Sequence, residues 1–168
     1  NRLSEYYSFD TKSDTEVLLT AYHHYGINFT DHLEGMWALA IYDETKNRVI
    51  LSRDRFGEKP LYYTHNKNEF IFGSEVNYIK EILGKKLEID KEKLNNFLVF
   101  GYRTIFSTDS TFIQNVKSFP KSETWEIDQD SKVIKKHRYW HVNYRENKKI
   151  SFEDIVDQTE ELITNSIE

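Results

Sequence analysis

Met36-Trp37-Ala38-Leu39-Ala40-Ile41-Tyr42 decides the fold, because this stretch contains no charged residue, no proline and no glycine. An unbroken apolar run predicts a strand that is covered on both faces. It is far shorter than the roughly 20 residues that a membrane-spanning helix needs. Further short strands are predicted at residues 48–52, 61–64 and 70–73, separated by polar turns. Connections this short predict that the four strands pair antiparallel with their chain neighbours, as a β-meander.

The clearest predicted helix lies before these strands. Ser13-Asp14-Thr15-Glu16 has the form of a capping box, in which Ser13 accepts a hydrogen bond from the Glu16 N–H while the Glu16 side chain reaches back. Apolar residues follow at helical spacing, and Gly26 stands where a positive-φ C-terminal cap belongs. The pattern predicts a helix of about three turns.

Further elements are predicted from caps and apolar spacing. They are a short helix over residues 30–35 that buries Leu33, a helix capped by Ser74 and ended by Gly84, a helix capped by Asp90, a hairpin of residues 123–127 with 132–136, and a helix opened by Ser151 with Ile155, Thr159, Leu162 and Ile163 inward. Helices beside an antiparallel sheet give an α+β class. The polar stretch 143–149 predicts a boundary between residues 1–142 and 143–168.

Composition excludes several kinds of site. The chain has no cysteine, which removes disulfides, zinc–thiolate sites, iron–sulfur clusters and a cysteine nucleophile. Its net charge of -5 and its short basic stretches argue against a nucleic-acid partner. Six histidines occur, none at a metal-binding spacing, so no metal site is predicted. No membrane segment and no secretory signal are predicted.

Two charged segments leave alternatives open. Residues 53–58 are either a charged hairpin turn with an internal Arg–Asp pair, which physical reasoning favours, or a functional surface in which such a pair fixes a loop beside a site. Asp14 is either a structural carboxylate that complements the helix dipole or a group that holds a substrate ammonium. The residues alone do not choose between these readings.

Four segments in this order resemble a known family. They are residues 13–19 (SDTEVLL), 33–43 (LEGMWALAIYD), 53–63 (RDRFGEKPLYY) and 72–75 (FGSE). Together they are similar to the glutaminase half of glutamine-hydrolysing asparagine synthetase, a class II glutamine amidotransferase of the N-terminal-nucleophile hydrolase group. Residues 100–102, 105–106 and 139–140 resemble the passage of that family into its synthetase domain.

The resemblance implies an αββα four-layer sandwich, here incomplete at its N-terminus. It implies a cysteine nucleophile at the mature N-terminus, so no catalytic residue is expected in this chain, and it assigns Asp14 to the α-ammonium of glutamine. Ammonia would pass to a second domain, where ATP and Mg²⁺ serve the amidation of aspartate. No cofactor is expected for this chain. A cytoplasmic location is expected, with a homodimer as one possible assembly.

Departures from the family pattern qualify these expectations. No nucleophile cysteine and no Asn-Gly-Glu strand are present, and the chain stops before a Ser-Gly-Gly-x-Asp-Ser loop. Phe119-Pro120-Lys121-Ser122 stands where the family has a proline–glycine turn. We therefore expect a piece of the parent enzyme, cut at both ends and inactive alone. The alternatives are a relative that amidates a sugar or another acid, a non-catalytic binding or scaffold domain, and an unrelated α+β domain.

Overall fold

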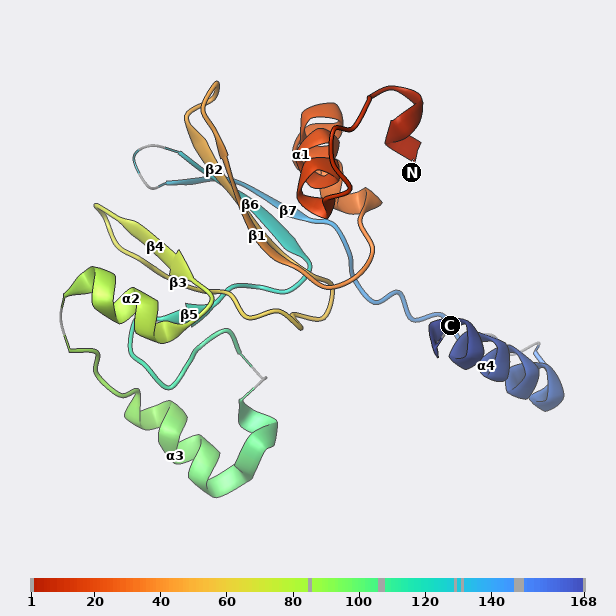
Figure 1. The fold of residues 1–168 in the computed structure, drawn as a ribbon. Helices are drawn as coiled ribbons and strands as arrows, with labels where there is room; N and C mark the ends of the chain where they lie inside the picture. Colours follow the sequence, from red (N-terminus) through yellow and green to blue (C-terminus); the bar gives the residue numbers. More distant parts are fainter. Residues whose placement is uncertain are drawn as a thin grey trace.

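The computed structural model describes residues 2–84, 86–105, 108–128, 130, 132–146 and 150–167. Within these residues, seven strands form two antiparallel sheets (Figure 1). The first sheet has the order β1-β2-β6-β7 and the second the order β4-β3-β5. The strands are β1 (Ala38–Asp43), β2 (Arg48–Arg53), β3 (Tyr62–His65), β4 (Phe70–Gly73), β5 (Lys117–Ser118), β6 (Glu123–Asp128) and β7 (Val133–Arg138).

The helices agree with the sequence pattern in their existence and approximate bounds. They are α1 (Asp14–Tyr25), α2 (Val76–Leu83), α3 (Lys91–Phe100) and α4 (Phe152–Ile167), with the 3₁₀ turns η1 (Arg2–Glu5), η2 (Gly26–His32) and η3 (Gly101–Thr104). Two predicted stops are confirmed, because Gly26 and Gly84 end their helices with φ values of 60° and 61°. The predicted cap at Asp90 is also confirmed, since its side chain accepts a 2.9 Å hydrogen bond from the Lys93 N–H.

The predicted β-meander is wrong at its centre. The hairpins β1–β2 and β3–β4 form as expected, but β2 pairs with β6 and not with β3. Leu51 of β2 lies opposite Trp125 of β6, far along the chain. The cause is local, because the chain after β2 turns out of the sheet through a loop in which Gly57 has φ 73°. The short connection to β3 therefore passes from one sheet to the other.

The stretch around β1 is covered on one face only, which corrects the expectation of a strand buried on both. The strand begins at Ala38 and lies at the edge of the first sheet. Ile41 is 6% exposed, whereas its neighbour Tyr42 is 59% exposed. Successive side chains of a strand point to opposite faces, so one face of β1 packs against the molecule and the other lies in solvent.

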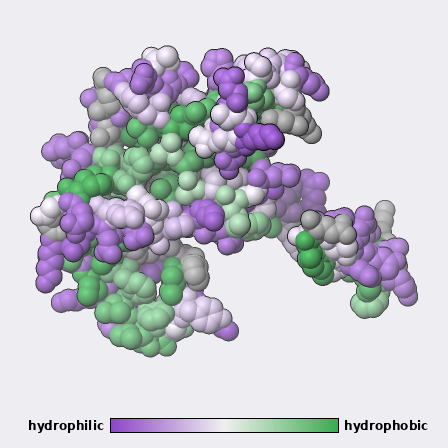
Figure 2. Space-filling view, viewed as in Figure 1, coloured by the Kyte–Doolittle hydropathy of each residue, from purple (hydrophilic) through white to green (hydrophobic). Residues whose placement is uncertain are grey.

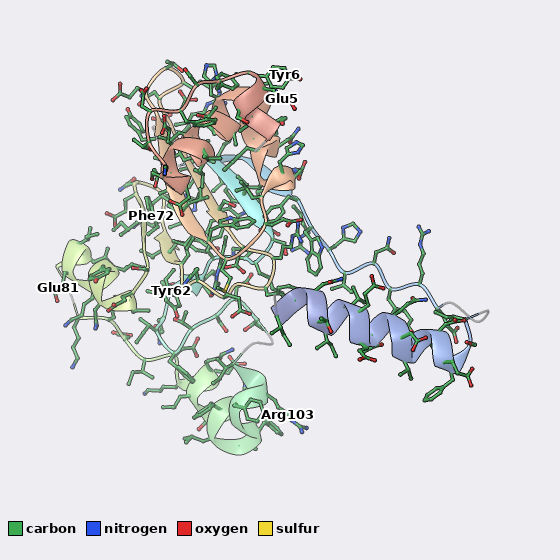
Figure 3. The ribbon with its side chains drawn as sticks, turned by 45° about the vertical axis from the view of Figure 1, so that its right-hand side comes forward. Glu5, Tyr6, Tyr62, Phe72, Glu81 and Arg103 are labelled. Atoms are coloured by element: carbon green, nitrogen blue, oxygen red, sulfur yellow. The ribbon has the colours of Figure 1, made fainter. Side chains whose placement is uncertain are left out.

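Three hydrophobic clusters connect the helices and sheets in succession. The first joins α1 and η2 to the first sheet through buried Ala21, Phe29, Ile41 and Ile50. The second lies between the sheets and is built on Leu51, Leu61, Phe119, Trp125 and Ile127. The third joins the second sheet to α2 through Ile71, Ile79 and Val116. Both faces of the second sheet are used, because Tyr62 belongs to the α2 cluster and Phe72 to the cluster between the sheets (Figure 3).

Two smaller predictions fail in detail, and a third is confirmed. The predicted helix over 30–35 is a 3₁₀ turn that ends at His32, so Leu33 is extended and only partly buried. Ser74 does not cap α2, whose N-cap residue is Glu75 without a side-chain hydrogen bond. Ser151 does begin α4, since its Oγ accepts from the Asp154 N–H at 3.1 Å.

The apolar face of α4 is not turned inward in this structure. Ile155, Leu162 and Ile163 are 44–68% exposed, and α4 lies to one side of both sheets (Figures 1 and 3). A second exposed apolar area covers the C-terminal half of α3 and the start of η3, seen as green surface in Figure 2. The candidate site described below lies on a different helix, α1.

No helix in the described ranges combines the length and the apolar character that crossing a membrane requires.

Candidate functional site

Asp14 is the first residue of α1 and lies exposed at the helix N-terminus. Within the described part of the chain, no hydrogen bond or ion pair engages its carboxylate. A negative side chain in the first turn is favoured by the helix dipole, so this position suits a carboxylate. The structure therefore presents Asp14 as an exposed, unpartnered carboxylate whose backbone is held at the start of α1.

The turn that precedes Asp14 is closed by hydrogen bonds that differ from the predicted capping box. Ser13 Oγ accepts from the Thr15 N–H at 3.2 Å and not from Glu16. Glu16 does reach back, but it accepts from the N–H groups of Asp10 at 2.9 Å and Thr11 at 2.8 Å. The exchange predicted between Ser13 and Glu16 is therefore wrong in its partners. The chain enters the helix through a tight turn, which brings those earlier amides to the carboxylate.

Thr11 links the two caps of this turn. Its Oγ1 donates to Glu16 Oε2 at 2.5 Å and accepts from the Ser13 N–H at 3.1 Å. The hydrogen bonds from Thr11 and from the Asp10 amide lower the pKa of Glu16 below its usual value. The ionised Glu16 carboxylate thus holds the start of the turn at Asp10 and Thr11. Through the Thr11 hydroxyl it also holds Ser13.

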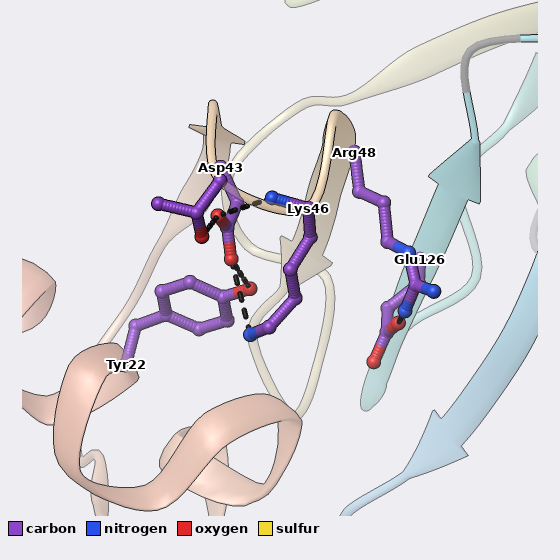
Figure 4. A network of polar contacts seen from close by, with 6 residues as sticks. Tyr22, Asp43, Lys46, Arg48 and Glu126 are labelled. Carbon is purple, nitrogen blue, oxygen red and sulfur yellow. Dashed lines mark hydrogen bonds and ion pairs between the residues drawn. The ribbon is translucent and has the colours of Figure 1, made fainter.

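The other half of α1 is fixed to the first hairpin by a polar network around Asp43 (Figure 4). The Tyr22 hydroxyl donates to Asp43 Oδ2 at 2.8 Å, and Lys46 Nζ lies 3.1 Å from the same oxygen. Hydrogen bonds from Thr45 and Tyr22 hold the pKa of Asp43 well below its usual range, while burial and Asp43 raise the pKa of Tyr22. Beside this network, Arg48 of β2 pairs with Glu126 of β6 at 2.8 Å (Figure 4). Helix α1 is therefore anchored to the sheet while its N-terminus is open.

The second charged segment is arranged differently, and its predicted internal Arg–Asp pair is wrong. The Arg53 guanidinium donates to backbone carbonyls and one hydroxyl, with all distances between 2.6 and 2.8 Å; the acceptors are the carbonyls of Gly57, Lys59 and Phe119 and the Oγ of Ser118. Because Arg53 ends β2 and Ser118 belongs to β5, one side chain joins the two sheets. A planar guanidinium suits this task, since it presents several donors in a fixed fork.

Asp54 gathers the amides of the loop that follows it. Its side chain accepts from the N–H groups of Phe56, Glu58 and Lys59, each at 3.0 Å. Asp54 is only 1% exposed. Burial alone would raise its pKa, but these N–H groups outweigh that effect and lower the pKa of Asp54 below its usual value. Arg53 and Asp54 therefore both bind the protein's own backbone.

Sequence reasoning missed two residues that complete this loop. Ser122 adopts φ 60°, donates through its hydroxyl to the Arg55 carbonyl at 2.8 Å and donates through its N–H to the Asp54 carbonyl at 3.0 Å. The Tyr139 hydroxyl donates to the Arg53 carbonyl at 2.6 Å. Ser122 could have been identified from its place in the segment that replaces the family's proline–glycine turn. Glycine in such a turn adopts a positive φ, and Ser122 does the same here. The sequence pointed to Tyr139 only as part of the Tyr139-Trp140 pair, which resembles the family.

The structure does not bring Asp14 and the 53–59 loop together. Helix α1 packs on the first sheet through the cluster around Phe29, whereas the loop lies where the ends of β2 and β5 meet. Among the described residues, no group of three His, Asp or Glu side chains is arranged to hold a metal ion. The predicted glutamine residue and the unusual charged loop are therefore separate features.

A comparison with known proteins finds a matching family model and several similar proteins. A family model described as a glutamine amidotransferase domain matches residues 1–140. Asparagine synthetase [glutamine-hydrolyzing] 2 of Bacillus subtilis is 33% identical, with 95% of this chain and 22% of that protein covered. Putative asparagine synthetase [glutamine-hydrolyzing] 2 of Methanocaldococcus jannaschii is also 33% identical, with 78% of this chain and 25% of that protein covered.

A relative with a different name matches a shorter part of the chain. Amidase chry2 of Gibberella zeae is 37% identical, with 45% of this chain and 11% of that protein covered. The chain thus spans about a quarter or less of the length of these curated relatives.

Proposed function

Because the chain belongs to the glutamine amidotransferase family, we propose that residues 1–142 form the glutaminase domain of a longer enzyme. This domain releases ammonia from the side-chain amide of glutamine, and the full enzyme uses that ammonia to make asparagine. The observation that carries the proposal is the family match over residues 1–140, which includes the turn that presents Asp14 without a partner.

Asp14 in this proposal holds the α-ammonium of glutamine. A carboxylate and an ammonium at hydrogen-bond distance attract strongly, because charge assistance roughly doubles the strength of the hydrogen bond. The anchored helix supports this role, since Tyr22 and Asp43 fix α1 to the sheet and leave its N-terminus accessible. The nucleophile is a cysteine outside these residues, which attacks the amide carbon, expels ammonia and leaves a thioester for water to hydrolyse.

The relatives and the packing support the remaining parts of the proposal to different degrees. The three successive hydrophobic clusters support an αββα sandwich of the N-terminal-nucleophile hydrolase type. Residues 143–168 are a linker and the first helix of an ATP-dependent synthetase domain, in keeping with the exposed apolar face of α4. That domain would use ATP, Mg²⁺ and aspartate in the cytoplasm. The second candidate is an acceptor other than aspartate, because one relative carries the name amidase and not asparagine synthetase.

Glutamine use by the full-length enzyme tests the role of Asp14. Asp14→Ala is expected to raise the KM for glutamine on the order of a hundredfold, since losing a charge partner costs about 2–5 kcal/mol. Synthesis from added ammonia should stay unchanged. Asp10→Ala is the matched control, because Asp10 lies in the same turn and contributes only its N–H.

Two results would count against the proposal. Equal loss of glutamine-dependent and ammonia-dependent activity in Asp14→Ala would indicate a structural carboxylate. The 168-residue chain alone has no cysteine and is expected to release no glutamate, so measurable release from purified chain would contradict the assignment of the nucleophile.

A further inference from the structure

Glu16 is the residue on which the turn around Asp14 depends. Its two carboxylate oxygens accept three hydrogen bonds, from the Asp10 N–H, the Thr11 N–H and Thr11 Oγ1, at 2.5 to 2.9 Å. These contacts tie the chain before Asp14 to the helix after it. Asp14 therefore lies on a short segment that is held at both ends.

Thr11 extends this hold to the residue next to Asp14. Its hydroxyl donates to Glu16 and accepts from the Ser13 N–H, while Ser13 Oγ accepts from the Thr15 N–H. The backbone on either side of Asp14 is thus fixed by a chain of hydrogen bonds that begins at Glu16. None of these bonds uses the Asp14 carboxylate, which leaves it available for a ligand.

We propose that Glu16 is a positioning residue for glutamine binding: through Thr11 and Ser13 it holds Asp14 where the carboxylate meets the substrate ammonium. This inference rests on the proposed function of Asp14. Glu16 acts through the geometry of the turn and does not itself touch the substrate. Its place in the first turn of α1 would by itself make Glu16 only a helix cap. Its additional role comes from the relay of hydrogen bonds from Glu16 to Thr11 and from Thr11 to Ser13, the residue before Asp14.

The test measures glutamine kinetics in the full-length enzyme for two ways of breaking the relay. Glu16→Ala and Thr11→Val are each expected to raise the KM for glutamine about tenfold or more, with kcat little changed, because a displaced carboxylate makes a weaker charge-assisted hydrogen bond to the substrate ammonium. Thr11→Ser keeps the hydroxyl and should restore the KM. Glu44→Gln, an exposed glutamate in the first hairpin, is the control.

A double-mutant cycle separates positioning from a merely structural cap. In an Asp14→Ala background, Glu16→Ala should have little further effect on the KM, since nothing remains to be positioned. An equal effect in both backgrounds, or a parallel loss of ammonia-dependent activity, would overturn the inference.

The remaining outcomes distinguish its failure from that of the proposed function. If Asp14→Ala weakens glutamine use and Glu16→Ala does not, the role of Glu16 falls and that of Asp14 stands. If Glu16→Ala raises the KM and Thr11→Val does not, Glu16 acts by charge and positioning is wrong. If Asp14→Ala has no effect, both fall together.

Discussion

The turn at residues 10–16 and the loop at residues 53–59 are both rich in charge, yet they treat their charges in opposite ways. In the loop, Arg53 and the buried Asp54 bind backbone carbonyls and N–H groups of the protein itself. In the turn, Glu16 binds the backbone and leaves the neighbouring carboxylate of Asp14 exposed. The difference therefore lies in individual side chains: Arg53 and Asp54 are satisfied by the protein's own backbone, whereas the Asp14 carboxylate has no partner among the described residues.

Arg53 and Asp54 stabilise the connection between the two sheets. Arg53 spans from the end of β2 to the residues around β5, and Asp54 organises the turn that carries the chain from the first sheet to the second. Hydrogen bonds to charged groups contribute about 1.5–3 kcal/mol each, more than neutral ones. A connection that must leave one sheet and enter another is thereby given one conformation.

The largest expected effect is on stability and separates the two regions. Asp54→Ala should lower the free energy of unfolding of the 168-residue chain by about 3 kcal/mol or more, because each donor left without an acceptor costs about 1–3 kcal/mol. Asp14→Ala, the same change at the exposed carboxylate, should alter it by less than about 0.5 kcal/mol. Urea denaturation followed by tryptophan fluorescence measures both. Similar losses for the two variants would refute the comparison.

A second prediction uses the pH dependence of the buried carboxylate. The pKa of Asp54 is lowered in the folded chain, so its ionised form contributes stability that is present above the unfolded value of about 3.9 and is lost as pH falls through the folded value. Asp54→Asn retains one acceptor oxygen but places an NH₂ group against backbone donors. The difference in stability between the chain and this variant should be constant above about pH 5 and shrink below about pH 4.

Urea midpoints measured from pH 6 to pH 3 check this dependence. Asp14→Asn is the control, and its small difference from the unaltered chain should not follow the same curve. A difference for Asp54→Asn that grows on acidification would have the wrong sign and would exclude a stabilising ionised Asp54.

Local patterns in the sequence were sufficient to predict most helices and strands. The cap at Asp90, the stop at Gly84 and the hairpin of β6 with β7 depend on neighbouring residues, and each was predicted. The pairing of β2 with β6 was not, because strands separated by a long stretch of chain leave no mark on each other's sequence. The apolar run at β1 also misled, since an edge strand with uncharged residues on its exposed face resembles a buried one in sequence.

The predictions for the site divide in the same way, between a residue that a local motif identified and contacts that no motif could predict. The family motif singled out Asp14, and the structure finds that carboxylate exposed, but no pattern could say that Glu16 would accept from Asp10 and Thr11 in place of Ser13. Nor could it say that Arg53 and Asp54, adjacent in sequence, would bind backbone groups instead of each other. Arg53 is the last residue of β2 and Asp54 the first residue of the loop, and they bind different backbone groups, carbonyls for Arg53 and N–H groups for Asp54.

The smallest expected effect concerns Ser13, which acts within the turn alone. Ser13→Ala removes the acceptor of the Thr15 N–H and should cost about 1 kcal/mol of unfolding free energy, the usual value of an N-cap. Ser74→Ala is the matched control, because Ser74 was predicted to cap α2 and makes no such bond, so it should change stability by less than about 0.5 kcal/mol. Thermal unfolding of both variants measures the difference. If Ser13→Ala were as damaging as Asp54→Ala, the turn would support the whole domain as the loop does, and the distinction between a locally closed turn and a connection between sheets would have to be abandoned.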